Sequence, residues 1–392
     1  MGIDDQAHGI IEALYDATFD PAQFQTVAER TRLWLGGNAA LVLVSDRSDG
    51  RPLLGALSDI DPDRWREYEA HYYKGDVWLQ RAFARPPGSV VMGFDLASRD
   101  ELATSEWYHD FLNSQDIHDF TGCLADIPTS LAGMLNVFRP RSAEPFSALE
   151  SAQMAALEPY VSRAFQFRLR LEEVETAARA QQAALDRLPF GVILVDGKGR
   201  VAGTNETARK IVARGDGFRP NRKGLEPRKQ EDHARLATLI ETAIDHHLGR
   251  HWGGGGVTSV QRTSLRPPYS VMVCPVPPRA DRPDLLGTSR AAAIVFIGDP
   301  AARPDPPAAV LAHLFGLTAA EARLAVRIAA GETPAAAADA LGVTVGTARN
   351  QLKAIMAKTG ARRQADLVAI LFSSVATLVT PDTERDGQGF AN

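Results

Sequence analysis

The sequence predicts a multidomain α+β chain, with two domains built on antiparallel sheets followed by an all-α domain of four helices. Three observations carry this prediction. At 392 residues the chain is too long for one ordinary domain. β-branched segments alternate with amphipathic helices before a Pro-rich break at Gly298–Val310, and only capped helices follow that break.

The predicted organisation has six parts along the chain. They are a first sheet-containing domain (1–145), a helical connector (146–188), a second sheet-containing domain (189–300), a Pro-rich linker (301–310), a helical domain (311–380) and a disordered tail (381–392). Hydrophobic residues make up 45% and charged residues 23%, which is ordinary globular usage.

Composition also indicates the cellular compartment of the protein. The net charge is −5, and Cys123 and Cys274 are its only cysteines, which suits a reducing compartment. The first residues lack a basic signal-peptide region, and no apolar run reaches the ~18 residues of a membrane span. We therefore expect a soluble, cytoplasmic protein with no membrane partner.

The first domain begins with helical patterns at Ile3–Asp16 and Pro21–Leu35, followed by a strand at Asn38–Asp46. More helices precede apolar strand segments in Gly122–Phe138. Helices flanking an antiparallel sheet in this order resemble a GAF-like sensory domain.

The connector reads as one helix from about Phe146 to Leu188, with a kink expected at Pro159. Residues spaced alternately by three and four form an a/d seam, which favours a parallel dimer helix over a stripe packed on its own domain. The seam consists of Ala164, Phe167, Leu171, Val174, Ala178, Gln181, Leu185 and Leu188.

The second domain reads as two strands, helices and three strands. Strands are predicted at Gly191–Val195, Arg200–Gly203, Gly256–Arg262, Tyr269–Val276 and Arg290–Ile297, with a helix capped by Asn205 after the second strand. This order and the stretch from Leu188 to Asn205 resemble a PAS domain. Its early helix lacks the reactive cysteine of a flavin photoreceptor.

The last domain carries the strongest local signals. Thr318 and Glu321 form a capping box, Thr333-Pro334 begins a second helix that ends at Gly342, and Thr344 caps a third helix that ends at Gly360. A fourth helix spans about Arg363–Leu378. The second and third helices form a helix-turn-helix, whose later helix enters the major groove of DNA.

The third helix has two predicted faces. Its packing side consists of Val345, Ala348, Leu352, Ile355, Met356 and Thr359, and its opposite side of Gly346, Thr347, Arg349, Asn350, Lys353 and Ala357. No acid lies between Thr344 and Arg363, although the whole chain is acidic. Segment Leu311–Ser373 has 7 basic and 4 acidic residues, so double-stranded DNA is the expected partner.

This segment resembles the DNA-binding domain of LuxR/FixJ-type transcriptional regulators. It keeps the Leu317, Thr318 and Glu321 opening, Leu341-Gly342, Lys358 and Gly360. The resemblance implies phosphate contacts at Thr344, Thr347 and Lys358, with Arg362 at the same end, and Arg349, Asn350, Gln351 and Lys353 in the groove. It also implies that the fourth helix is a dimer surface.

The segment departs from the family pattern at three places. Ala348 replaces a β-branched residue, Ala336-Ala337 replaces a Glu-Ile pair, and Gln351 replaces a groove-side histidine. The two alanine changes predict a lean core, that is, one built from small side chains. The change at Gln351 affects which base the helix would prefer.

The first domain holds a cluster of aromatic residues with polar edges, which suits the wall of a small-molecule pocket as well as an ordinary core. The candidate pocket residues are Trp65, Tyr68, Tyr72, Asp76, Trp78 and Trp107. The order of Trp65, Tyr68 and Asp76 resembles the pocket of acyl-homoserine-lactone receptors, with different spacing and with Val77 in place of a proline.

We therefore expect a homodimeric one-component transcriptional regulator gated by a small-molecule effector or a partner. Two alternatives remain: an acyl-homoserine-lactone receptor, and a constitutive DNA-binding dimer whose PAS-like domain only mediates interaction. No catalytic motif is present, and His246, His247 and His251 lack the further ligands of a metal or haem site, so we expect no enzyme activity, metal or cofactor.

Overall fold

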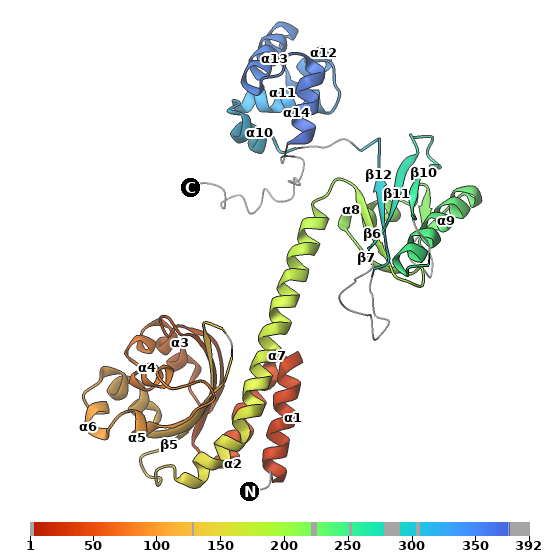
Figure 1. Ribbon diagram of the computed structural model, residues 1–392. Coiled ribbons are helices and arrows are strands. Elements are labelled where there is room, and N and C mark those ends of the chain that lie inside the picture. Colours follow the sequence, from red (N-terminus) through yellow and green to blue (C-terminus); the bar gives the residue numbers. More distant parts are fainter. Residues whose placement is uncertain are drawn as a thin grey trace. The chain divides into compact units, whose positions relative to one another are not determined.

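A computed structural model describes residues 4–127, 129–220, 226–250, 253–277, 291–302, 306–374 and 376 (Figure 1). The chain divides into two compact units, Met1–Ala178 and Arg179–Asn392. The predicted tail at 381–392 lies outside the described residues.

The first unit is built on a five-stranded antiparallel sheet in the order β2-β1-β5-β4-β3. The strands are β1 (Ala39–Asp46), β2 (Pro52–Ser58), β3 (Val90–Met92), β4 (Asp119–Leu124) and β5 (Leu131–Arg139). The predicted strand at Asn38–Asp46 is β1, and the apolar segment Gly122–Phe138 is a hairpin of β4 and β5.

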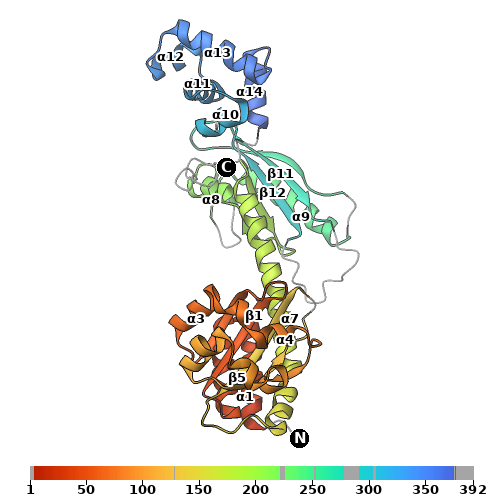
Figure 2. The ribbon, with the colours of Figure 1, turned by 90° about the vertical axis from the view of Figure 1, so that its left-hand side faces the viewer.

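Helices cover both faces of this sheet (Figures 1 and 2). On one face lie α1 (Asp5–Phe19), α2 (Phe24–Leu35) and the first half of α7 (Ala148–Asp186). The other face is covered by α3 (Pro62–Ala70), η2 (Tyr72–Gly75), α4 (Val77–Phe83), α5 (Gly93–Leu96), α6 (Arg99–Leu102) and η3 (Trp107–Leu112). Two short turns, η1 (Pro21–Gln23) and η4 (Asn113–Gln115), complete the unit.

Strand alternation explains the two layers. In β5, Leu135 and Val137 face the α1–α2–α7 layer, while Met134 and Phe138 face the other layer. Because both faces of the strand are buried, its sequence is a nearly continuous apolar run.

Helix α7 runs without interruption through Pro159, and its role changes along its length. Met154, Leu157, Val161, Ala164 and Phe165 are buried in the core of the first unit. The predicted seam residue Ala164 therefore belongs to that core. Farther along, Phe167 is 62% exposed and Val174 is 54% exposed.

The second unit contains a five-stranded antiparallel sheet in the order β10-β11-β12-β6-β7. The strands are β6 (Gly191–Val195), β7 (Val201–Thr204), β10 (Gly256–Val260), β11 (Tyr269–Pro275) and β12 (Ala293–Gly298). Helices α8 (Glu206–Ala213) and α9 (Gln230–His247) and a small ribbon of β8 (Phe218–Arg219) and β9 (Glu226–Pro227) complete it. The five predicted strands are present, although the predicted start at Arg290 lies outside the described residues.

The helical part consists of α10 (Ala308–Phe315), α11 (Ala319–Ala329), α12 (Pro334–Leu341), α13 (Val345–Thr359) and α14 (Gln364–Ser373). The prediction of four helices is therefore wrong by one. Helix α10 begins inside the predicted 301–310 linker because Leu311 is fully buried and anchors it to the helical core. The predicted end of the last helix at Leu378 lies outside the described residues.

Small side chains let these helices approach one another closely. Ala337, Ala338 and Ala348 are fully buried, together with Leu324 and Ile355. Of the alanines that predicted this core, Ala337 and Ala348 are part of it, whereas Ala336 is exposed.

Among the described helices, no single one is long and apolar enough to span a membrane. The bent pair α10 and α11, at 111° to each other, passes that test only when the two are taken together.

Candidate functional site

The binding residues predicted from the sequence fall in two regions of the chain. One is a cavity between the β-sheet and the aromatic helices of the first unit. The other is the solvent face of α13. Each is built from local signals in its own segment.

The cavity lies on the α3–α4 face of the first sheet and has a volume of about 40 Å³. Trp65 and Tyr68 from α3, Asp76 and Trp78 at the start of α4, and Trp107 from η3 line it. The structure therefore brings together five of the six predicted pocket residues. Further lining residues are Leu41, Leu43, Ile60, Leu79, Phe111, Leu112, Ile117, Phe120, Met134, Asn136 and Phe138.

Tyr72, the sixth predicted residue, does not line this cavity. It lies in η2, where its ring centroid is 5.7 Å from that of Phe111 and 4.9 Å from that of His71. Helix α3 ends at Ala70, so Tyr68 lies in the helix and is buried, whereas Tyr72 lies beyond it and is half-buried.

Local sequence places the inward-facing aromatics. Asp61 and Pro62 begin α3, and Asp76 begins α4 by accepting a hydrogen bond from the Leu79 N–H at 2.8 Å. On β2, Gly55 leaves room for Trp65, because a Cβ at this position would lie 2.6 Å from the Trp65 ring. Replacement of this glycine would displace the Trp65 wall.

A buried Tyr–Asp pair is the polar centre of the cavity. The Tyr68 hydroxyl donates a hydrogen bond to Asp76 Oδ2 at 2.8 Å, and both residues are buried. Burial raises the pKa of Asp76 to about 6, although hydrogen bonds from Leu79 and Tyr68 oppose the rise. Burial and the Asp76 charge raise the pKa of Tyr68 well above its usual range.

Three further polar atoms in the cavity wall lack a hydrogen-bond partner among the described residues. They are the indole nitrogens Nε1 of Trp78 and Trp107 and the side-chain oxygen of Asn136. Buried polar atoms are nearly always paired, so two donors and an acceptor on residues that line one cavity indicate a place for polar groups of a ligand or water.

Asn136 is a lining residue that the sequence pattern did not predict. It lies in the apolar stretch LAGMLNVFR of β5, on the same strand face as Met134 and Phe138. The signal that could have identified it is a single amide side chain at an inward position of an otherwise apolar strand.

The cavity is small in this conformation. A volume of about 40 Å³ has room for on the order of three water molecules. A ligand with an acyl chain or a ring requires the aromatic side chains to move outward.

The second region begins with the turn between α12 and α13. Gly342 ends α12 with φ 67°, a backbone conformation that a side chain disfavours. The Thr344 hydroxyl then accepts the Thr347 N–H at 3.1 Å and fixes the start of α13. The predicted order of two helices joined by a turn is present as α12 and α13, and the predicted Thr318–Glu321 capping box begins α11.

Helix α13 buries Ala348, Leu352 and Ile355 and exposes Arg349, Asn350 and Lys353, as predicted. Within the described part of the chain, neither Arg349 nor Lys353 forms an ion pair. Both cations are therefore available to a partner. Gln351 is half-buried at the edge of this face.

One predicted packing residue is misplaced. Val345, in the first turn of α13, is 39% exposed, because the helix begins beyond the edge of the core that Ala348 and Leu352 contact. The packing prediction for Val345 is wrong.

The other predicted contact residues lie at the two ends of α13. Thr344 and Thr347 are exposed at its N-terminus, and their hydroxyls lie 2.9 Å apart. Lys358 donates to Glu321 Oε2 at 2.7 Å, so its ammonium already has a partner within the domain. The Arg362 side chain is exposed before α14.

Other candidate sites are less complete. The described residues contain no group of three or more His, Cys, Asp or Glu side chains arranged for a metal ion. His247 Nδ1 lies 2.7 Å from the Val276 carbonyl, His246 Nδ1 accepts from the Gly253 N–H, and His251 lies outside the described residues.

No family model and no curated protein matches the chain. Solved structures do match. The VqsR LBD domain from Pseudomonas aeruginosa has 18% identity and a TM-score of 0.36, and the match covers 43% of this chain and 98% of that chain. CepR2, an N-acylhomoserine lactone dependent LuxR family transcription factor from Burkholderia cenocepacia, has 15% identity, a TM-score of 0.30, and coverage of 41% and 94%.

Escherichia coli SdiA matches along more of the chain, with 11% identity, a TM-score of 0.26, and coverage of 93% of this chain and 92% of SdiA. At these identities and TM-scores, the likeness assigns neither a family nor a ligand to this chain.

Proposed function

We propose that this chain is a homodimeric one-component transcriptional regulator of the LuxR/FixJ type. It binds double-stranded DNA through α12 and α13, and the GAF-like first unit and the PAS-like part of the second receive its signal. The observation that carries the proposal is the face of α13, where Arg349, Asn350 and Lys353 are exposed on a rigid, capped helix-turn-helix.

This face has the chemistry of a reading helix. Arginine and lysine can bind guanine or phosphate, and asparagine can make paired hydrogen bonds with adenine. Gly346 and Ala357 on the same side are small, so the helix backbone can come close to the groove floor.

The DNA prediction is tested with Arg349→Ala and Lys353→Ala in the full chain. We expect each change to weaken operator binding by about 1–3 kcal/mol if the side chain contacts a base. A contact to phosphate would instead weaken binding to all sequences and reduce the salt dependence. Footprinting on the promoter of its own gene supplies the operator, and mobility-shift titrations supply the affinities.

Lys198→Ala is the matched control, because Lys198 is an exposed cation in the turn between β6 and β7. Its loss changes the net charge equally without touching α13. Unchanged DNA affinity in both α13 variants would remove the basis for the assigned face.

The signal that we propose for the first unit is a small, uncharged amphipathic molecule in the aromatic cavity. The Trp78 and Trp107 indoles can donate to its carbonyl oxygens, and Asp76 can accept from an amide or hydroxyl. An acyl-homoserine lactone has such groups and is one candidate.

Mobility shifts with and without a small-molecule extract separate a ligand-gated regulator from a constitutive dimer. Tyr68→Phe is the matched variant, since it removes one hydroxyl from the cavity and leaves the helical domain unchanged. Equal DNA binding under all four conditions would favour the constitutive alternative.

A further inference from the structure

The first unit contains a second, larger cavity that the proposed function does not use. Its volume is about 230 Å³, and it shares no lining residue with the aromatic cavity. It is lined by residues of α5, α6, η3, the start of β4 and the loop after β5, namely Phe94, Arg99, Asp100, Leu102, Ala103, Tyr108, His118, Asp119, Pro140, Arg141, Ala143 and Pro145.

Two arginines line this cavity, Arg99 and Arg141, and both are exposed. The Arg99 guanidinium lies over the Phe94 ring at 4.7 Å, and neither arginine forms an ion pair with any described residue. The Arg141 backbone is held by the Asp116 carboxylate, which accepts its N–H at 3.3 Å. Unpaired guanidinium groups are the side chains best suited to bind carboxylate or phosphate.

A hydrogen-bonded Tyr–His pair forms part of the same wall. The Tyr108 hydroxyl lies 2.7 Å from His118 Nδ1. Burial lowers the pKa of His118, and the positive charges of Arg141 and Arg99 lower it further, against the opposing charge of Asp116. Both arginines are thus close enough to act on this imidazole.

Among the described residues, neither acidic residue of the wall forms an ion pair with these arginines. Burial raises the pKa of Asp119, and the charge of Arg99 is among the effects that lower it. Asp119 is buried, and its two oxygens accept the backbone N–H groups of Phe120 at 2.9 Å and Phe146 at 3.0 Å. Asp100 is exposed. The remaining wall is apolar, with Phe94, Leu102 and Pro140 among its members.

We propose that this cavity binds a small organic anion, either a carboxylate or a phosphate monoester. Arg99 and Arg141 hold its acidic group, Tyr108 and His118 supply neutral hydrogen-bonding groups, and Phe94 and Leu102 contact its hydrocarbon part. This site goes beyond the proposed function, because it depends on neither DNA binding nor the aromatic cavity.

The proposal is tested by calorimetric titration of the full chain with benzoate, phenyl phosphate and benzyl alcohol. We expect saturable binding of one or both anions, and binding of the uncharged alcohol at least about tenfold weaker. The stronger of the two anions identifies the acidic group as carboxylate or phosphate. The absence of saturable binding by both anions at millimolar concentration overturns the proposal.

Variants locate the site. Arg99→Gln and Arg141→Gln each weaken anion binding by about tenfold or more, whereas Arg51→Gln, an exposed arginine at the start of β2, has no effect. Tyr68→Phe in the aromatic cavity also leaves anion binding unchanged. Equal affinity in wild type and the Arg99→Gln/Arg141→Gln double variant overturns the assignment.

A second readout does not depend on affinity. A bound anion favours the charged form of a neighbouring imidazole, so the His118 NMR titration shifts to higher pH when benzoate or phenyl phosphate is added. A His118 titration unmoved by a saturating anion contradicts the site.

Discussion

At the scale of single residues, Asp76 carries the clearest electrostatic signal of the first unit. It caps α4, accepts the Tyr68 hydroxyl and lies in the cavity wall. The same carboxylate therefore serves both the fold and the candidate ligand site, and the two roles respond to pH together.

Asp76 contributes to the free energy of unfolding in a way that depends on pH and can be tested. Its pKa of about 6 in the folded chain lies above the ordinary 3.8, so the folded state binds this proton more tightly than the unfolded state. The contribution is fully present below the ordinary value and is lost as pH rises through about 6. The loss corresponds to about 3 kcal/mol.

Asp76→Asn isolates this effect, because asparagine can still cap α4 and stays uncharged. The free energy of unfolding of wild type minus that of the variant should fall by about 3 kcal/mol between roughly pH 3 and pH 8. Urea denaturation followed by tryptophan fluorescence measures it. Groups with lowered pKa, such as Glu150, have the opposite slope but cancel in the difference. A difference independent of pH contradicts the prediction.

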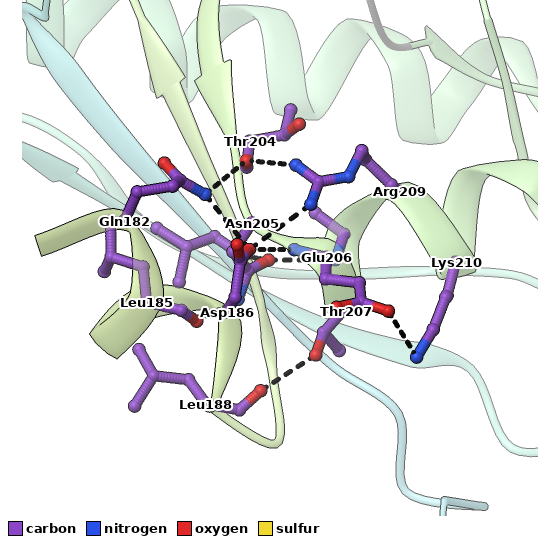
Figure 3. A network of polar contacts seen from close by, with 12 residues as sticks. Gln182, Leu185, Asp186, Leu188, Thr204, Asn205, Glu206, Thr207, Arg209 and Lys210 are labelled. Atoms are coloured by element: carbon purple, nitrogen blue, oxygen red, sulfur yellow. Dashed lines mark hydrogen bonds and ion pairs between the residues drawn. The ribbon is translucent and has the colours of Figure 1, made fainter. Parts of the chain in front are cut away.

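At the scale of elements, the junction between α7 and α8 is joined by reciprocal capping (Figure 3). Asn205 Oδ1 accepts the N–H groups of Val192 at 2.8 Å and Ala208 at 2.9 Å. Its Nδ2 donates to the carbonyls of Leu185 and Phe190, both at 2.9 Å. One buried side chain thus joins the end of the long helix, the first strand and the next helix.

Asp186, at the end of α7, completes the reciprocal arrangement. Its Oδ1 accepts the Glu206 N–H at 2.6 Å and the Gln182 amide at 3.0 Å. The last turn of α7 and the first turn of α8 therefore satisfy each other's terminal backbone groups. Any rotation of this end of α7 acts directly on the sheet edge.

Asn205→Ala should destabilise this junction by about 3 kcal/mol, because it removes an N-cap and leaves buried backbone groups unpaired. Hydrogen–deuterium exchange of β6 and α8 in the full chain measures the local opening free energy. Thr207→Val is the matched comparison, since it removes only the hydroxyl bond to the Leu188 carbonyl at 2.8 Å and should cost about 1 kcal/mol. Equal effects of the two changes argue against a central role for Asn205.

At the scale of the whole molecule, the exposed part of α7 is the strongest indication of assembly. Phe167 and Val174 are largely exposed on a helix that is otherwise well formed, and Leu171 lies between them on the predicted seam. Exposed large apolar side chains at coiled-coil spacing indicate a partner helix. A dimer would also present two α13 helices to half-sites about one DNA turn apart.

Leu171→Cys tests the parallel seam in a Cys274→Ser background, where the buried Cys123 is the remaining native thiol. We expect a disulfide-linked dimer under mild oxidation, because seam residues of a parallel pair meet their own copies. Glu173→Cys is the control, since it lies two positions away on the other side of the helix. Absence of the Leu171→Cys dimer, or equal crosslinking at both positions, rules out this seam.

Local chemistry in the sequence determined much of this architecture. The Thr318–Glu321 box, the Thr333-Pro334 start, the Gly342 turn and the Thr344 cap each act within a few residues, and all are present in the structure. The solvent face of α13 follows from helical periodicity alone, so Arg349, Asn350 and Lys353 were predictable. The start of α10 was not, because burial of Leu311 depends on helices later in the chain.

Only the tertiary structure decided which side chains share a cavity. Asn136 joins the wall formed by Trp65 and Trp107 because β5 pairs between β1 and β4, a non-local pairing that no short segment specifies. The same holds for Arg99 and Arg141, which come from α6 and the loop after β5. Caps, turns and helix faces are fixed by neighbours in sequence, whereas cavities are fixed by packing between distant segments. The sequence therefore predicted one candidate ligand pocket, and the tertiary structure added a second.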